Sequence, residues 1–522
     1  MTTRLRNAIT DDNRRWWTLG AMCFALFMIM LDNTVVNVAL PSIQKDLHSS
    51  IGGLEWTVNA YTLSFAVLLV TGGRLGDIFG RRKMFLFGVV TFAASSAFIG
   101  LAQSEAWLVS GRAVQGIGAA FMMPATLSII SNAFPPEERG KAIGMWAGVS
   151  ALALAVGPVV GGFLVENVSW QSIFFLNVPV GLLAVFVTLT AAHESRDETA
   201  AQTVDIPGVA TITVGLAALV LALVEGNSWG WGSPGILLLF ALAVAGLAAF
   251  AIVETRVANP MVQFAFFRSR SFLGANVVGF IVSFSMLAVL FFLALYMQNV
   301  HGYSPLETGV RFLPSTFIII FAGPIAGRLA DRIGPRPLMT AGMTLVAISL
   351  FWQGHLAVDT SYLSLAGAFV ILGLGMGTIM SPMSTAAMNA VDPTKAGAAS
   401  GMLSMSRMVG GTFGVAAMGA LISGLGRHKL DQLLPQLPDD ARQKLADGLG
   451  AGATGGSGAT HDAVMSAFLY ALNDGLRIAA LMALVGAVAA WLLIDKRIPS
   501  PVPAQTQAEA PEAVAAAETV AV

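Results

Sequence analysis

The sequence has little charge and a single cysteine, and these shortages exclude several classes of protein. Only 11% of its 522 residues are charged, whereas a soluble domain usually carries about 25%. Together with 55% hydrophobic residues and a mean hydropathy of +0.72, this shortage excludes an ordinary globular enzyme. The lone Cys23 excludes a disulfide framework and a CxxC metal site. A net charge of −1 gives no indication of nucleic-acid binding.

The sequence also lacks the motifs of enzymes and of ATP-driven pumps. The six histidines are scattered and lie mostly in loops. No P-loop or other nucleotide-binding motif is present in the chain. We therefore expect a protein that is not an enzyme, with no catalytic residues, no cofactor, no resident metal and no direct use of ATP.

What the chain does have is a series of long apolar segments. A membrane-spanning helix needs about 20 mostly apolar residues, and we find fourteen segments of this kind. They cover roughly residues 16–40, 54–73, 84–103, 107–131, 142–165, 172–192, 206–226, 235–254, 272–298, 307–328, 337–357, 361–389, 397–425 and 475–495. The sequence therefore predicts an all-α membrane protein with fourteen transmembrane helices, twelve being the main alternative.

The distribution of basic residues predicts how the chain is oriented. If both termini are cytoplasmic, most of the 29 lysines and arginines fall in the termini and the cytoplasmic loops, as the positive-inside rule requires. A long last outer loop, 426–474, also carries basic residues, but long loops cross the membrane largely regardless of charge. We predict a multi-pass protein of a bacterial inner membrane with both termini in the cytoplasm.

Two short sequences occur twice, at nearly the same separation along the chain. GRLGDIFGRR (Gly73 to Arg82) returns as GRLADRIGPR (Gly327 to Arg336), and PEERGKAIGM (Pro136 to Met145) returns as PTKAGAASGM (Pro393 to Met402). This spacing indicates a duplicated six-helix unit, and internal repeats are typical of secondary transporters. Two further helices are then inserted between the halves.

The repeat divides the chain into five expected parts. They are a cytoplasmic N-terminus 1–15, a six-helix bundle 16–192, a linker with two inserted helices 193–256, a second six-helix bundle 257–498 that contains the outer loop 426–474, and a disordered cytoplasmic tail 499–522.

Five motifs carry a resemblance to a known family. They are the loop GRLGDIFGRRK (Gly73 to Lys83), GRAVQGIGAA (Gly111 to Ala120), GVSALALAVGPVVGG (Gly148 to Gly162), LDNTVVNVALP (Leu31 to Pro41) and WQSIFFLNVPVG (Trp170 to Gly181). In their order along the chain and on these helices, the motifs resemble those of the major facilitator superfamily, in its fourteen-helix drug:proton antiporter branch. The resemblance covers nearly the whole chain. It implies export by alternating access of two rocking bundles.

The repeated loops predict a cytoplasmic gate. Carboxylates beside arginines at helix ends can pair across the two halves and contact helix termini. The alternative is a topology signal with solvated charges. The second loop departs from the first by Pro335, where the first has Arg81. The expected gate residues are Gly73, Asp77, Arg81, Arg82, Asp331 and Arg332.

Asp32 is the acid that stands out inside a predicted span. An acid at that depth costs about 2.5–3.5 kcal/mol on insertion scales, so it normally faces a cavity or a partner. Arg112 lies at a similar depth in the same half. We predict that Asp32 binds the coupling proton and that Arg112 balances its charge. A static structural ion pair is the alternative.

Other positions are candidates for bundle contact and for the substrate cavity. The antiporter motif contributes Gly148, Gly157, Pro158, Gly161 and Gly162. These residues allow close helix approach, which is also ordinary packing. The expected cavity residues are Gln115, which shares a face with Arg112, Arg407, which has no local acid, and Met405 in a methionine-rich stretch.

We therefore predict a proton-coupled exporter of hydrophobic small molecules or drugs, as in multidrug efflux and antibiotic resistance. Its partners are the substrate, protons and the lipid bilayer, and the requirement for a periplasmic adaptor stays open. One alternative is a dedicated exporter or importer of one metabolite, lipid, siderophore or self-made antibiotic. Another is a non-transporting membrane sensor, which would need neither paired gate loops nor charges inside the membrane.

Overall fold

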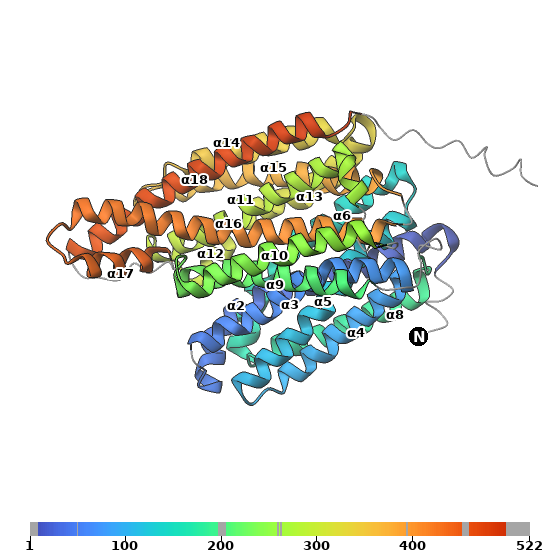
Figure 1. The fold of residues 1–522 in the computed structure, drawn as a ribbon, viewed down its shortest axis with the longest axis horizontal. Helices are drawn as coiled ribbons and strands as arrows, with labels where there is room; N and C mark the ends of the chain where they lie inside the picture. The colour runs from blue at the N-terminus through green and yellow to red at the C-terminus, as the bar shows by residue number, and fades with distance from the viewer. Residues whose placement is uncertain are drawn as a thin grey trace, which may run out of the picture.

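The computed structural model describes residues 9–49, 51–196, 205–257, 260, 264–392, 395–450 and 459–496. Every element in this part of the chain is a helix (Figure 1). The predicted all-α fold is confirmed. Residues 1–8 of the expected N-terminus, residues 197–204 of the expected linker and the expected tail 499–522 lie outside the described residues.

The helices follow the predicted order, with four additional short elements. The first part holds α2 (Asp11–Leu47), α3 (Ile51–Phe79), α4 (Arg81–Gly100), α5 (Glu105–Ala133), α6 (Pro136–Asn167), α7 (Ser172–Phe175) and α8 (Asn177–Ala191). The middle holds α9 (Ile206–Trp229) and α10 (Pro234–Arg256). The last part holds η1 (Phe264–Arg268), α11 (Arg270–Asn299), α12 (Pro305–Arg311), α13 (Leu313–Ile333), α14 (Pro335–Gln353), α15 (Tyr362–Asn389), α16 (Ala396–Leu433), α17 (Asp439–Gly450) and α18 (Ala459–Leu493).

The number of membrane crossings follows from length and apolar composition. Within the described residues, 12 helical segments are long and apolar enough to cross a membrane. The α6 and α14 helices, with 32 and 19 residues, are not among them. The chain is thus a multi-pass membrane protein, and fourteen crossings stays a prediction.

The helices pack in two groups, with the inserted pair on their flank. Most helices from α2 to α8 pack chiefly on one another, and so do most from α11 to α18, while α6 packs as closely on α13 as on α2. The α10 helix packs on α9, which lies against α3 and α16. The start of α2 and the end of α18 lie at the same end of the molecule, on the right of Figure 1. We call this the termini end, and the opposite one the far end.

The segment expected as a long outer loop, 426–474, is largely helical instead. The α16 helix continues to Leu433, α17 follows, and α18 begins at Ala459. Ion pairs from Arg442 of α17 to Asp431 of α16 and to Asp439 hold this polar region together. Hydropathy finds where a helix is apolar, but a helix that leaves the bilayer continues in water as long as its backbone bonds and side-chain pairs persist. The glycine-rich residues 451–458 lie outside the described part.

One predicted span is broken by proline. The segment 307–328 contains the end of α12 and most of α13, with the boundary at Phe312. Pro314 lies in the first turn of α13, where its missing N–H is tolerated but interrupts the hydrogen bonds of a continuous helix.

Candidate functional site

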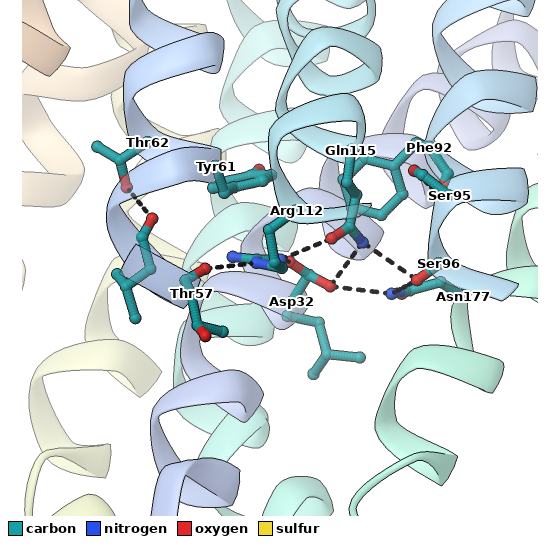
Figure 2. Close-up of polar contacts among 12 residues, drawn as sticks. Asp32, Thr57, Tyr61, Thr62, Phe92, Ser95, Ser96, Arg112, Gln115 and Asn177 are labelled. Carbon is teal, nitrogen blue, oxygen red and sulfur yellow. Dashed lines mark hydrogen bonds and ion pairs between the residues drawn. The ribbon is translucent and has the colours of Figure 1, made fainter. Parts of the chain in front are cut away.

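Asp32 and Arg112 meet in the interior of the first group of helices (Figure 2). Asp32 comes from the middle of α2 and is 4% exposed, and Arg112 comes from the second turn of α5 and is 1% exposed. One terminal nitrogen of Arg112 lies 2.5 Å from Asp32 Oδ2. The structure therefore joins the two charges that the sequence placed at similar depth.

The remaining donors of Arg112 are also engaged. Its Nε donates to the Thr57 carbonyl of α3 at 3.0 Å, and Nη1 donates to Gln115 Oε1 at 2.6 Å. The guanidinium carbon lies 4.2 Å from the ring centroid of Tyr61. Such a cation–π contact adds stabilisation where water is excluded. Arg112 is thus held by an acid, an amide, a backbone carbonyl and an aromatic ring.

Two side-chain amides hold the second oxygen of Asp32. Gln115 Nε2 and Asn177 Nδ2 donate to Oδ1 at 2.9 and 3.1 Å, and both amides also contact Ser96 Oγ, at 3.1 and 2.9 Å. Five helices, α2, α3, α4, α5 and α8, thus contribute to one buried polar network (Figure 2). A buried carboxylate is tolerated only with this kind of compensation.

A narrow recess reaches this network. It is lined by Leu31, Asp32, Val35, Val36, Ile173 and Asn177. Val35 and Val36 follow Asp32 toward the far end, and Ile173 belongs to α7 at that end. The side of Asp32 that borders this recess therefore faces the far end of the molecule.

Several members of the network were not predicted from the sequence. Ser96, Thr57, Tyr61 and Asn177 all contact Asp32, Arg112 or their partners. Asn177 carried a usable signal, because it is a polar residue inside the apolar motif from Trp170 to Gly181. Nothing in the sequence indicated the contact with the Thr57 carbonyl, because a backbone carbonyl is present at every position.

At the termini end, the end of α3 is hydrogen-bonded to the start of α16. Asp77 is fully buried, and its two oxygens accept from the backbone N–H groups of Gly397 at 2.9 Å and Ala398 at 2.7 Å, in the first turn of α16. Arg81 donates to Asp77 Oδ1 through Nε at 3.0 Å and Nη2 at 2.8 Å. A carboxylate is favoured at a helix N-terminus by the helix dipole.

Close backbone packing accompanies this contact. A Cβ on Gly73 would collide with the Gly397 carbonyl, and one on Gly401 would lie 3.1 Å from the Leu69 carbonyl. We call the contact of Gly73, Asp77 and Arg81 with Gly397, Ala398 and Gly401 the arginine clasp.

The repeated sequences form a second contact of the same kind, between α13 and α6. A Cβ on Gly140 of α6 would collide with the carboxylate of Asp331 and lie 2.6 Å from the Gly327 carbonyl, and one on Gly144 would lie 2.7 Å from the Gly323 carbonyl. Ser381 Oγ also donates to the Gly140 carbonyl at 2.8 Å. Pro335 begins α14 at the position equivalent to Arg81. We call the contact of Gly323, Gly327 and Asp331 with Gly140 and Gly144, together with Pro335 at the start of α14, the proline clasp.

Two expected gate residues lie outside both clasps. Arg82 donates to the Leu189 carbonyl at 3.0 Å, within its own group of helices. Arg332 is exposed. The two clasps therefore depend on the glycines and acids of the repeated motifs, with Arg81 as their buried arginine.

The glycines of the antiporter motif contact two different partners. A Cβ on Gly148 would lie 3.4 Å from the Ile320 carbonyl of α13, whereas one on Gly157 or Gly161 would meet Thr34 or Val35 of α2. Gly162 has nothing within 4 Å of that position. The side chain of Pro158 lies outside the described residues. This helix, α6, thus connects the Asp32 helix to the opposite group.

The three expected cavity residues are separated in the structure. Gln115 is fully buried in the Asp32 network. Met405 is half-buried and packs on the apolar core. Arg407 lies on α16 against Gly279 of α11, where a Cβ on the glycine would be 3.2 Å from Arg407 Cγ.

Comparisons with known proteins agree with this architecture. The model of the Major Facilitator Superfamily matches residues 22–415. The Tetracenomycin C resistance and export protein of Streptomyces glaucescens is 36% identical over 512 residues, which are 94% of this chain and 95% of that protein. The Multidrug resistance protein Stp of Mycobacterium tuberculosis (strain CDC 1551 / Oshkosh) is 36% identical over 428 residues, 82% of this chain and 79% of that protein.

Solved structures show the same fold at much lower sequence identity. The proton:xylose symporter XylE, bound to 6-bromo-6-deoxy-D-glucose, superposes with a TM-score of 0.61 at 13% identity and covers 94% of this chain and 97% of that one. The family model and the extended similarity to the resistance and export proteins show that the chain belongs to the major facilitator superfamily.

Proposed function

We propose that this protein exports hydrophobic small molecules, antibiotics among them, in exchange for protons, and that it is a transporter without enzymatic activity. The observation that carries the proposal is the enclosed carboxylate of Asp32, paired with Arg112 and joined to five helices. The similarity to the tetracenomycin C export protein and to the multidrug resistance protein supports export as the direction. Asp32 and Arg112 are the proton-coupling residues in this scheme.

The chemistry of the network supports a coupling step at Asp32. An ionised carboxylate only accepts hydrogen bonds, whereas its protonated form has one donor and loses acceptor capacity. The donors on Arg112, Gln115 and Asn177 therefore cannot all keep their present partners once Asp32 gains a proton. Because the network joins five helices, its rearrangement would reach most of the first group.

The two clasps act as a gate in this scheme. We infer that the termini end faces the cytoplasm of a bacterial inner membrane, so the molecule is closed toward the cytoplasm and releases substrate at the far end. Residues 16–192 and 257–498 would move as two bundles, with 193–256 as their linker. Gly148, Gly157, Pro158 and Gly161 of α6 would transmit the change at Asp32 to α13. Gly162, Arg82 and Arg332 have smaller roles, because no contact in the described residues joins them to the opposite group.

A second candidate function is a dedicated exporter of one self-made antibiotic or related metabolite. The name of the tetracenomycin C relative favours this candidate. Both candidate functions use the same coupling residues, but they differ in the range of compounds that the protein carries. Measuring transport of a panel of unrelated cations and neutral drugs therefore distinguishes the two. Export of a single compound class would favour the dedicated exporter. Unchanged efflux when periplasmic adaptor proteins are removed would exclude the adaptor.

The proposal is tested by ethidium efflux from cells that produce the wild type or Asp32→Asn, with and without a protonophore. We expect wild-type efflux to stop on adding the protonophore, and Asp32→Asn to lack the protonophore-sensitive part. The matched control is Asp46→Asn, an acid at the exposed end of the same helix that accepts from Trp170 Nε1 at 2.8 Å. Efflux by Asp32→Asn at the wild-type rate, with the same protonophore sensitivity, would refute the coupling role.

A further inference from the structure

Arg407 is a second arginine well inside a membrane helix, in the opposite group from Asp32. It lies eleven positions into α16, and Gly279 lies at a similar depth in α11. Its Nε is buried without a hydrogen-bond partner in the described part of the chain. The residue as a whole is partly exposed. An arginine cannot release its proton.

Arg112, Arg81 and Arg407 differ in how their charge is balanced. Arg112 has Asp32, Gln115 and a backbone carbonyl, and Arg81 has Asp77. For Arg407 the described residues provide no ion pair. A charged group at such a depth normally pairs with an acid, meets a water-filled cavity or marks a substrate pathway.

The surroundings of Arg407 are suited to an organic ligand. Gly279, Met383 and Leu403 pack closely around its aliphatic part: a Cβ built on the glycine would lie 3.2 Å from Arg407 Cγ, 3.3 Å from the Met383 thioether and 3.4 Å from the Leu403 side chain. Ser404 shares the Arg407 face of α16, and Ser283 shares the Gly279 face of α11. The site thus combines a fixed cation, two nearby hydroxyls and flexible apolar walls, which is the composition of a ligand site.

We propose that Arg407 binds the carboxylate or phenolate of an amphipathic substrate, so that organic anions with aromatic or aliphatic bodies are among the compounds that the protein carries. The planar guanidinium presents two parallel N–H donors to a carboxylate. The apolar part of the ligand lies against Met383 and Leu403. This inference rests on the proposed function, because it names the substrate class of the same transporter. It also assigns the two charges separate tasks: Asp32 takes the proton and Arg407 takes the substrate anion.

The test compares two ligands that differ only in the anion. One is a xanthene dye with a free benzoate, and the other is the methyl ester of the same dye. Binding to purified protein is followed by fluorescence polarisation in a neutral maltoside detergent, so that no anionic lipid occupies the site. We expect the wild type to bind the acid about ten-fold more tightly than the ester, as one charge-assisted pair predicts.

Three variants test whether Arg407 causes the preference for the acid over the ester. Arg407→Gln should weaken binding of the acid about ten-fold and leave the ester unchanged. Arg407→Lys keeps the charge without the planar pair of donors and should restore part of the preference. The matched control is Arg311→Gln at the far end of the same group, where the guanidinium carbon lies 3.6 Å over the Tyr303 ring; it should keep the full preference. Monodisperse elution of each variant confirms folding.

The inference and the proposed function fail in different ways. A wild type that binds acid and ester equally, or that does not bind the acid, overturns the anion site. So does an Arg407→Gln protein that keeps the wild-type preference. Proton-driven ethidium efflux is measured separately. If ethidium efflux persists when the anion site is overturned, the proposed function stands without the anion site. If wild-type vesicles move no ethidium under a pH gradient, the proposed function fails.

Discussion

The two clasps have the same backbone design and differ in their charges. Both bring a glycine and an aspartate from one helix against the first turns of a helix in the other group. In the arginine clasp, Asp77 is fully buried and paired with Arg81, which is 1% exposed. In the proline clasp, Asp331 is half-buried, and Pro335 stands at the equivalent position. Duplication therefore preserved the steric fit, while the arginine that pairs with the aspartate of the first clasp is replaced by a proline in the second.

This difference predicts that the two sides contribute unequally to closure of the termini end. A buried charge depends on its partner, because solvent cannot replace the partner when it is removed. A half-buried carboxylate retains contact with water. Two buried serines provide reporters in a Cys23→Ser background: Ser400→Cys for the arginine clasp and Ser381→Cys for the proline clasp. Both serines are fully buried in the closed end, so the rate of thiol labelling measures its opening.

The largest effect is expected for Arg81→Gln. Removing one partner of a buried ion pair costs about 3–5 kcal/mol. Opening of the termini end avoids this cost, because water then reaches the Asp77 carboxylate. Labelling of Ser400→Cys should accelerate at least about 100-fold. The exposed Arg332 supplies the control, because Arg332→Gln should leave labelling unchanged. Equal rates for Arg81→Gln and the parent would show that the ion pair contributes nothing to closure.

The next effect is steric and should be similar on both sides. A methyl group on Gly73 or Gly327 would press on a backbone carbonyl of the opposite helix, and overpacking of this kind costs about 1–3 kcal/mol. Gly73→Ala and Gly327→Ala should each accelerate labelling of their own reporter by about ten-fold. Gly162→Ala is the control, because nothing lies within 4 Å of its added Cβ. A large effect on one side alone would contradict the equivalence of the two backbones.

Asp331→Asn should have a smaller effect. Because the carboxylate is half-buried, the electrostatic loss should stay within about 1 kcal/mol, and labelling of Ser381→Cys should rise at most about five-fold. Asp77→Asn should instead approach the Arg81→Gln rate, because it leaves Arg81 buried without its acid, and it should impair transport in protein that still inserts. Equal effects of the two asparagine variants on labelling would remove the distinction between the clasps.

The smallest effect is expected when the arginine is introduced into the second clasp. Pro335→Arg places a cation near Asp331 at the cost of a favourable helix-start proline. The net gain should be below about 1 kcal/mol, and labelling of Ser381→Cys should slow about two-fold. Faster labelling than in the parent would show that the second clasp depends on its proline.

The sequence predicted the fold class and the meeting of distant charges better than it predicted contacts between helices. Hydropathy and the duplicated motifs indicated the helices, and equal depth indicated that Asp32 and Arg112 could meet. The roles of Asn177 and Ser96 depend on the rotation of each helix about its axis, which hydropathy does not specify when helices are apolar on all sides.

Glu307 and Arg311 show that an acid and a base four residues apart on a helix need not form an ion pair. The Glu307 carboxylate accepts from the Ser304 N–H at 2.8 Å in a capping box, and Arg311 Nη1 donates to the Glu307 backbone carbonyl at 3.2 Å. The pattern Ser304-Pro-Leu-Glu307 was a readable helix-start signal, and it competes with the pairing of acid and base four residues apart.

The inserted pair of helices makes the two flanks of the molecule unlike. The α9 helix packs along both α3 and α16 and so covers the side where the arginine clasp lies. On the other flank, Phe163 of α6 and Phe317, Phe321 and Ile325 of α13 are more than half exposed. Acyl chains therefore touch the seam between α6 and α13 and are screened from the other seam. A change in bilayer thickness or lipid composition would act first through the proline side.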